Sequence, residues 1–180
     1  MAELINDRYA GSLFEAALDL GEIENFYKEL NNIKEIFLSE NQLIQILRHP
    51  RISKDEKKSL VGEIFGGKIS QELINFFYII IDRRREKYLY GIIDEFNKKY
   101  DEYMGILNVV AVTAIPMKDK DKERLASRLG KKLNKKIKLN NEIDESIIGG
   151  VMLKIGNKFM DNTLASQLKS METMIKDVSL

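Results

Sequence analysis

The hydrophobic pattern of this chain changes at Gly105, and no other feature constrains its fold as strongly. Before Gly105, apolar residues recur at helical spacing, whereas after it they form short β-branched runs and alternating segments. The charge balance changes at the same place: residues 1–105 carry 15 Lys/Arg and 19 Asp/Glu, and residues 106–180 carry 14 and 9. We therefore predict an α+β protein with two domains, residues 1–105 and residues 106–180.

The first domain is predicted to be a six-helix bundle, because six segments have an apolar face and short connections separate them. These segments are Ile5–Leu20, Glu22–Phe37, Leu43–Leu47, Lys57–Phe65, Leu73–Ile81 and Leu89–Tyr103. Ser53 and Glu56 have the spacing of a capping box, and Ser70 can cap the fifth helix. That fifth helix has almost no polar face, which predicts deep burial or a covering partner.

The first helix has a wide apolar surface, an arc of roughly 220° when residues are placed at about 100° per step. A helix packed on one core needs a stripe of only about 100°. Two interpretations remain open. The helix lies deep in the bundle, or its surplus face docks a partner helix, with Ala10 and Ala17 permitting close approach.

The second domain is predicted to be a small mixed α/β unit. Ile106–Ile115 is rich in β-branched residues and predicts a strand buried on both faces and closed by Pro116. Lys118–Leu133 predicts a charged helix, and Ile137 and Leu139 indicate a short strand.

The stretch from Asp144 to Asp161 is typical of a β-hairpin introduced by Gly149-Gly150. Val151, Leu153 and Ile155 share one face of a strand by period-two geometry. Gly156-Asn157 tolerates positive φ, so the chain can turn back. Asn162 or Thr163 is then predicted to cap a final helix, whose apolar residues are Leu164, Leu168, Met171 and Ile175.

Gly62 to Lys68 matches the first seven positions of a phosphate-binding P-loop. The eighth position needs a Ser or Thr hydroxyl for magnesium, and here it is Ile69. The preceding residues predict a helix where a P-loop requires a strand, so we interpret the glycines as a helix C-terminus. A nucleotide-binding enzyme would depend on this defective motif alone.

The remaining residues give no catalytic pattern. His49 is the single histidine, cysteine is absent, and the carboxylates are scattered among lysines. Metal binding or catalysis by His49 would need partners that the spacing does not supply. We therefore predict no catalytic, cofactor-binding or metal-binding residues, and a protein that is not an enzyme.

Lys118–Lys138 holds ten Lys/Arg against three acidic residues. Phosphate contacts by these cations would suit a nucleic-acid-binding accessory protein, which is the alternative function. However, the segment has no aromatic residues to stack on bases. A solvated face, or a docking face for an acidic protein, is the competing interpretation.

Composition indicates an intracellular, water-soluble chain. The absence of cysteine is typical of a reducing compartment, and Glu3 and Asp7 interrupt any signal-peptide layout. No apolar run approaches the ~18 residues that a membrane-spanning helix needs.

Five motifs occur in the order found in a known family. They are Arg8-Tyr9-Ala10-x-x-Leu13-Phe14, Leu47-x-x-Pro50-x-Ile52 with Lys57, Arg85-Glu86-x-Tyr88-Leu89, the strand Gly105–Ala114, and Asp144-x-Ser146-x-Ile148-Gly149-Gly150 through Asp161. On these residues the chain resembles, over essentially its full length, the delta subunit of bacterial F-type ATP synthase, the counterpart of the mitochondrial oligomycin-sensitivity-conferring protein. Glu145 stands where proline is common, and Asn162-Thr163 replaces the usual Gly-Ser after Asp161.

The resemblance implies a non-catalytic stator subunit of the peripheral stalk, which links the catalytic head to the membrane-anchored b-subunit stalk in proton- or sodium-driven ATP synthesis. Residues 1–105 would bind N-terminal segments of alpha subunits. Tyr9, Leu13 and Ala17 are the candidate contacts, in a groove between the first helix and the helix that begins near Ser70.

Residues 106–180 would hold the C-terminal end of the b subunit, and Gly149, Gly150 and Asp161 would be structural residues of the family motif. The resemblance implies no cofactor and no nucleic acid. Association with the cytoplasmic face of the cell membrane would come only through the complex.

Overall fold

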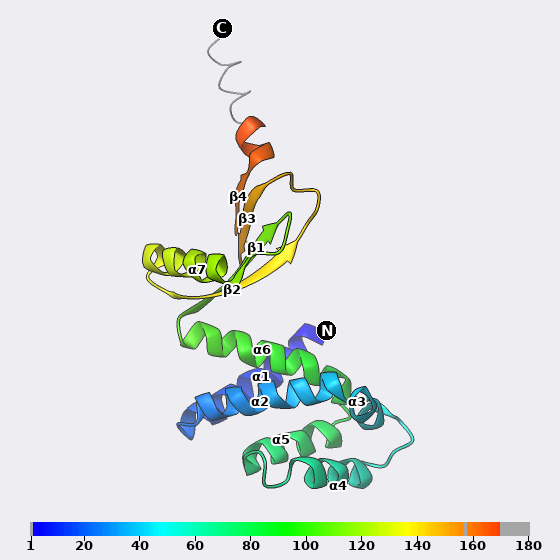
Figure 1. The fold of residues 1–180 in the computed structure, drawn as a ribbon. Coiled ribbons are helices and arrows are strands. Elements are labelled where there is room, and N and C mark those ends of the chain that lie inside the picture. Colours follow the sequence, from blue (N-terminus) through cyan, green and yellow to red (C-terminus); the bar gives the residue numbers. More distant parts are fainter. Residues whose placement is uncertain (1, 157, 170–180) are drawn as a thin grey trace. The chain divides into compact units, whose positions relative to one another are not determined.

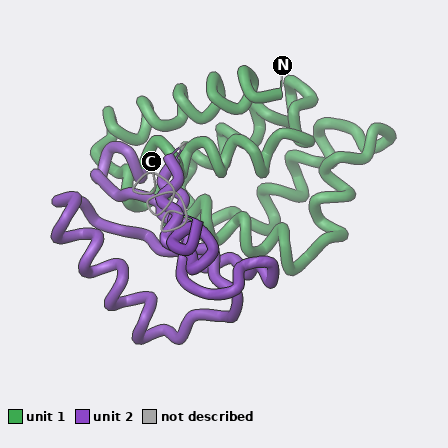
Figure 2. Tube along the Cα trace, turned by 90° about the horizontal axis from the view of Figure 1, so that it is seen from above, with its two compact units in different colours: residues 1–100 green, residues 101–180 purple. Residues whose placement is uncertain are grey.

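The computed structural model describes residues 2–156 and 158–169 (Figure 1). The chain divides into two compact units, residues 1–100 and residues 101–180, which have different colours in Figure 2. Helices make up the first unit, and the second contains a four-stranded mixed sheet. The fold class is therefore α+β. Met171, Ile175 and Asn157, which the sequence assigned to the last helix and to the hairpin turn, lie outside the described residues.

The helices before Gly105 follow the predicted segments. They are α1 (Ala2–Asp19), α2 (Ile23–Ser39), α3 (Asn41–Arg48), α4 (Lys54–Phe65), α5 (Gln71–Asp82) and α6 (Leu89–Tyr103). A single 3-10 turn, η1 (Glu86–Tyr88), was not predicted. Helix α3 stops because His49 precedes Pro50 and takes an extended conformation.

The two predicted serine caps have different outcomes. Ser53 and Glu56 form the capping box: Ser53 Oγ accepts from the Glu56 amide at 3.2 Å, and the Glu56 carboxylate accepts from the Ser53 amide at 2.8 Å. Ser70 is the N-cap residue of α5, but its hydroxyl makes no cap bond. Instead it donates to the Glu29 carboxylate of α2 at 2.7 Å. A side-chain cap by Ser70 is therefore wrong, because a tertiary partner takes the hydroxyl.

The core of the first unit contains a cluster of aromatic rings from four helices. Phe37 of α2 makes edge contacts with Phe65 of α4 and Phe77 of α5, at centroid distances of 6.0 and 6.3 Å. Tyr90 of α6 contacts Phe37 at 6.3 Å and donates its hydroxyl to the Phe37 carbonyl oxygen at 3.0 Å. Phe37, Phe65 and Phe77 are fully buried. Edge-to-face pairs add to the hydrophobic stabilisation that this burial supplies.

Helix α1 joins this core through two further ring contacts. The rings of Phe14 and Phe96 of α6 have a centroid distance of 5.7 Å, and those of Tyr9 and Phe76 of α5 a centroid distance of 6.4 Å.

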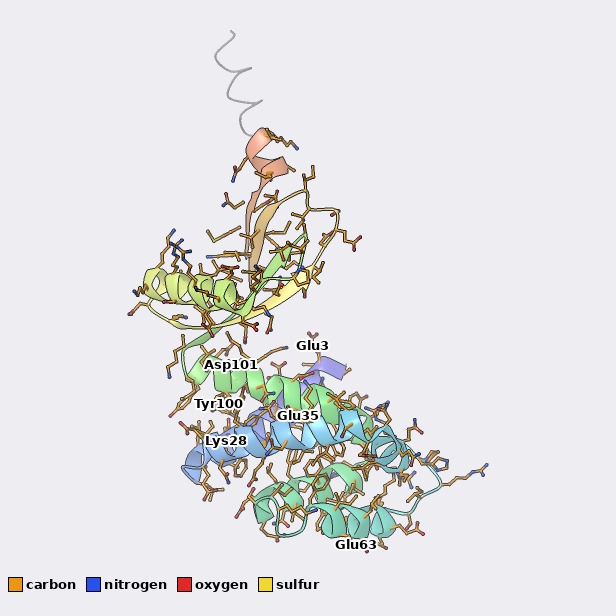
Figure 3. All side chains as sticks on the ribbon, viewed as in Figure 1. Glu3, Lys28, Glu35, Glu63, Tyr100 and Asp101 are labelled. Carbon is orange, nitrogen blue, oxygen red and sulfur yellow. The ribbon has the colours of Figure 1, made fainter. Side chains whose placement is uncertain are left out.

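Charged side chains of the first unit, such as Lys28, Glu35 and Glu63, are exposed on its outside (Figure 3).

One ion pair is buried within the first unit. Lys57 Nζ of α4 lies 2.7 Å from Glu86 Oε1 of η1, and each side chain is only 7% exposed. Removing either partner would leave an uncompensated buried charge, which costs about 3–5 kcal/mol.

The second unit is built on a sheet of strand order β2-β1-β3-β4. Its elements are β1 (Ile106–Thr113), α7 (Asp119–Leu133), β2 (Lys136–Ile143), β3 (Gly150–Ile155) and β4 (Lys158–Thr163). Strand β1 is parallel to β2, with α7 in the crossover, and antiparallel to β3, which is antiparallel to β4. The predicted first strand ends two residues early, and β2 is longer than predicted.

Helix α7 covers one face of this sheet, where Leu125 and Leu129 pack against Val109, Ala111 and Leu153 (Figure 1). On the opposite face of β1, Val112 is buried and Val110 is half-buried, but Asn108 is exposed. The prediction that β1 is buried on both faces is therefore wrong at Asn108.

Gly150 is the point of closest backbone approach in the hairpin. It has φ +90° and lies opposite Thr163. A Cβ at this position would lie 2.6 Å from the Asn162 carbonyl oxygen and 2.9 Å from the Thr163 Cα. Both obstacles are backbone atoms, so neither can rotate away.

We predict that Gly150→Ala strongly destabilises the β3–β4 pairing. A left-handed conformation costs an L residue roughly 1–2 kcal/mol, and overpacking adds about 1–3 kcal/mol. Urea unfolding and amide hydrogen exchange in β3 and β4 measure the loss. Gly156→Ala is the matched control, because Gly156 has φ +55° but nothing within 4 Å of the new Cβ. Equal losses in the two variants would contradict the close-approach argument.

Candidate docking surfaces

Strand pairing brings the three predicted motif residues of the second unit to one junction. The Leu164 amide donates to the Gly149 carbonyl oxygen at 3.0 Å. The Asp161 carboxylate accepts from the Thr163 amide at 2.9 Å and from the Ser166 hydroxyl at 2.6 Å. Gly149, Gly150 and Asp161 therefore connect β3, β4 and the helical residues 164–169.

The cap of this last helix is Thr163, one of the two predicted candidates. Its hydroxyl oxygen accepts from the Ser166 amide at 3.3 Å. The Ser166 hydroxyl, followed by the Thr163 amide, holds the pKa of Asp161 below its usual value, because both donate to the ionised carboxylate. Ser166 therefore joins the junction, although the sequence did not single it out.

The candidate contacts on α1 lie at different depths. Leu13 is 4% exposed and Ala17 is fully buried, so both pack inside the first unit. Tyr9 is half-buried. The exposed apolar residues of this region are instead Leu4 and Leu20. Of the three predicted residues, only Tyr9 is accessible to a binding partner without rearrangement of the core.

Tyr9 lines an open hollow between α1 and α5. From α5, Ile79 and Asp82 line the same hollow, and the other lining residues are basic: Arg8, Lys54, Arg83, Arg84 and Arg85. Ile79 is 51% exposed, although six other apolar residues of α5 are buried. The Lys58 ammonium, which donates to Asp82, lowers the pKa of that carboxyl group. The hollow thus combines an aromatic and an aliphatic side chain with a basic rim.

The second unit exposes apolar side chains around its C-terminal junction. Phe159 is 66% exposed, Met160 52%, Leu164 47% and Leu168 65%. Strand β4 is also an edge of the sheet. Exposed apolar side chains at the edge of a sheet are candidates for an interaction surface.

The basic segment Lys118–Lys138 forms α7 and the start of β2. Leu125 and Leu129 face the sheet, and most of the cations are exposed. Lys122 pairs with Asp119 at 3.2 Å. The arrangement is a solvated outer face of an amphipathic helix.

Within residues 2–156 and 158–169, no catalytic constellation is assembled. Gly62 lies inside α4, and Gly66 is its C-cap, so the P-loop-like segment is a helix C-terminus. His49 Nδ1 accepts from the Arg51 amide at 3.2 Å, which is a local turn contact. No group of three or more His, Cys, Asp or Glu in this part of the chain could hold a metal ion.

Among the described helices, none has both the length and the apolar character that crossing a membrane requires.

These observations describe a chain of two compact units, each of which exposes apolar side chains. A family model described as the ATP synthase delta (OSCP) subunit matches residues 5–175. The chain is 37% identical over 178 residues to the ATP synthase subunit delta of Alkaliphilus oremlandii, covering 99% of both chains. It is 34% identical over 175 residues to that of Clostridium kluyveri, covering 97% of both.

A solved structure agrees with the fold. The cryo-EM structure of the Toxoplasma gondii mitochondrial ATP synthase hexamer contains a chain that matches with a TM-score of 0.72 at 18% identity, covering 94% of this chain and 96% of that one. The chain described here belongs to the ATP synthase delta (OSCP) family. It is a structural component of the peripheral stalk, without catalytic activity. The nucleic-acid alternative has no support.

Two features of the structure were not predicted from the sequence: a buried ion pair in the first unit and the exposed apolar side chains of β4. The buried pair Lys57–Glu86 joins residues 29 positions apart, and no local pattern signals it. Phe159 and Met160 are adjacent in an edge strand, so one of them must point away from the helix-covered face. The exposure of one of these two side chains could therefore have been predicted from the alternation of side chains along the strand.

We predict that the Asp161 carboxyl group titrates below the usual Asp pKa of about 3.9, and that Ser166→Ala moves the midpoint back towards it. The stabilisation is present above the pKa of the unfolded chain and is lost as pH falls through the lowered pKa of the folded state. NMR titration of side-chain carboxyl carbons measures the midpoint.

Asp144 supplies an internal control for this titration. The Ser146 hydroxyl and amide lower its pKa in the same way. Ser166→Ala should leave the Asp144 midpoint unchanged. Movement of both midpoints together would indicate a general change in charge or folding rather than the loss of one hydrogen bond.

Proposed function

We propose that this chain links the catalytic head to the end of the b-subunit stalk, through the first and second units respectively. The observation that carries the proposal is that the match to delta subunits spans both units, over 178 residues. In this role the chain works at the cytoplasmic face of the membrane and reaches the membrane only through the complex. The associated process is proton- or sodium-driven ATP synthesis.

The hollow between α1 and α5 is the proposed site for an N-terminal segment of an alpha subunit. An amphipathic helix laid there would bury Tyr9 and Ile79, which the free chain leaves partly in water. The basic rim favours acidic side chains flanking the apolar face of the partner. Leu13 and Ala17 are buried residues of the same helix and would support α1 from the core.

We predict that Ile79→Asp weakens binding of an alpha N-terminal peptide by roughly tenfold or more, which corresponds to about 1.4 kcal/mol. The reason is that a carboxylate would be desolvated where the wild type buries an aliphatic side chain. Isothermal titration calorimetry measures the affinity, and the melting temperature is recorded on the same samples.

Ile36→Asp is the matched control, because Ile36 of α2 is also partly exposed but does not line the hollow. Ala17→Leu should behave differently from both, lowering the free energy of unfolding by about 1–3 kcal/mol through overpacking. Unchanged peptide affinity in folded Ile79→Asp protein would remove the α1–α5 site.

The proposed site for the b subunit is the apolar surface around β4, comprising Phe159, Met160, Leu164 and Leu168. A helix end packed there would cover the apolar side chains and also shield the strand edge. Aromatic side chains at the centre of an interface commonly dominate its binding energy.

We predict that Phe159→Asp weakens binding of a peptide from the C-terminal end of the b subunit by about tenfold or more, since losing one central aromatic anchor typically costs about 2 kcal/mol. Ser127→Asp on the exposed side of α7 adds the same charge outside the surface and should change the affinity less than about twofold. Surface plasmon resonance on the full-length variants separates these effects. An equal loss of peptide affinity in both variants would show that the added negative charge, and not the lost Phe159 contact, weakens binding.

We further propose that α1–α6 form one six-helix bundle that folds without the rest of the chain, as residues 1–105. Buried apolar residues on α1–α6 support this, as do the ring contacts that connect α1, α2, α4, α5 and α6.

We predict that a fragment of residues 1–105 unfolds in a single cooperative thermal transition, because its buried aromatic core involves no residue beyond 105. Circular dichroism at the helical minimum measures the transition. A gradual, non-cooperative loss of signal would place the boundary elsewhere.

A further inference from the structure

One cavity of the first unit has five cationic side chains in its lining, beside Pro50, Ile52 and one carboxylate. It has a volume of about 160 Å³ and lies where the α3–α4 loop meets the α5–α6 turn. Its charged lining consists of Arg48, Lys54, Lys57, Arg84, Lys87 and the single carboxylate Glu86. Several of the residues that carried the mid-chain family motifs line it, and it shares Lys54 and Arg84 with the proposed α1–α5 docking hollow.

The one carboxylate does not neutralise the cavity. Glu86 is already paired with Lys57 at 2.7 Å, and both side chains are buried. The other cations interact with neutral groups: Lys54 Nζ donates to the Asp82 carbonyl oxygen at 2.8 Å, and Arg48 donates to the Lys87 carbonyl oxygen at 3.4 Å. Such partners orient a cation without neutralising its charge. Of these two cations, Lys54 also interacts with the Asp82 carboxylate, whose pKa is lowered mainly by Lys58 and to a smaller extent by Lys54.

Arg84 and Lys87 have the least compensation. Lys87 Nζ lies 4.9 Å from the centre of the Tyr88 ring. Within residues 2–156 and 158–169, neither Arg84 nor Lys87 forms an ion pair with a carboxylate. Among the described residues, three cations of this lining, Arg48, Arg84 and Lys87, therefore form no ion pair with a carboxylate.

The backbone at Arg84 is strained in a way that glycine would avoid. Arg84 has φ +53°, and the only other described non-glycine residue with positive φ is Asn134. The Arg84 amide donates to the Ile81 carbonyl oxygen at 3.0 Å, which closes the end of α5 at this residue. Strain of this kind in a large side chain is typical of residues kept for a binding role.

We propose that this cavity binds a small inorganic phosphate anion, orthophosphate or pyrophosphate. Guanidinium groups donate in pairs to phosphate oxygens, and ammonium groups add point charges, so two arginines and two lysines suit a multivalent oxyanion. The small volume favours a free inorganic anion over a nucleotide. Binding of this anion does not depend on the stator role.

The test is an NMR amide titration of the full-length protein with pyrophosphate and then orthophosphate, with chloride adjusted to hold the ionic strength constant. Saturable shifts confined to residues 48–57 and 84–87, stronger for pyrophosphate, are expected. Arg84→Gln and Lys87→Gln should each weaken binding by at least about tenfold, because each removes a charge-assisted hydrogen bond. Shifts that rise linearly, or that spread over α7, would overturn the proposal.

Arg83→Gln is the matched control. Arg83 is the neighbouring arginine and carries the same charge, but it lines the α1–α5 hollow and not this cavity. It should change pyrophosphate affinity by less than about twofold, and an equal loss in Arg83→Gln and Arg84→Gln would reduce the effect to general electrostatics.

Arg84→Gly separates binding from folding. Glycine adopts the observed φ without strain, so this variant should melt at a higher temperature than wild type in the absence of phosphate, yet bind pyrophosphate at least about tenfold more weakly. Wild-type affinity in the folded Arg84→Gly and Lys87→Gln proteins would exclude the site.

Discussion

The arrangement of the first unit depends on a buried positive charge, that of Lys57, which would be strongly destabilising without an ion-pair partner. Lys57 of α4 is buried, and Glu86, in the 3-10 turn that precedes α6, is its ion-pair partner. A buried ion pair contributes less net stability than apolar groups of the same volume would, but a misplaced one is expensive. The pair therefore selects one arrangement of α4 against the α5–α6 turn. That turn passes through Arg84 in its left-handed conformation and brings the surrounding cations together.

In the second unit, a steric constraint has the corresponding role. Gly150 lets β3 approach the end of β4 more closely than any side chain would allow, which fixes the register Gly150–Thr163 and Met152–Asp161. With that register, Phe159 and Met160 point to opposite faces of an edge strand, and both are exposed. Exposure of these two apolar side chains to water contributes nothing to the stability of the second unit by itself. The proposed b-subunit partner would cover these side chains, and Asp161 holds the start of the helical residues 164–169 beside them.

Local rules predicted most elements, and tertiary partners account for the errors. The helices followed from apolar periodicity and the Ser53 cap from its spacing to Glu56, because both depend on neighbours in sequence. Ser70 failed as a cap because Glu29, distant in sequence, takes its hydroxyl. The wide apolar arc of α1 could not reveal which edge faces the core, and the structure shows that Leu13 and Ala17 are inside while Tyr9 lies at the rim.

Two units in one chain suit the mechanical task of the proposed stator. The turning central stalk exerts torque on the head, so the head must be held against rotation. A chain that binds the head with one unit and the stalk with the other places two moderate interfaces in series, and each bound partner raises the effective concentration of the chain at the second. Neither interface then needs a large buried area to hold its partner. In the proposed interfaces, the half-buried Tyr9 with Ile79, and the exposed Phe159, would serve as anchors while the complex supplies the proximity.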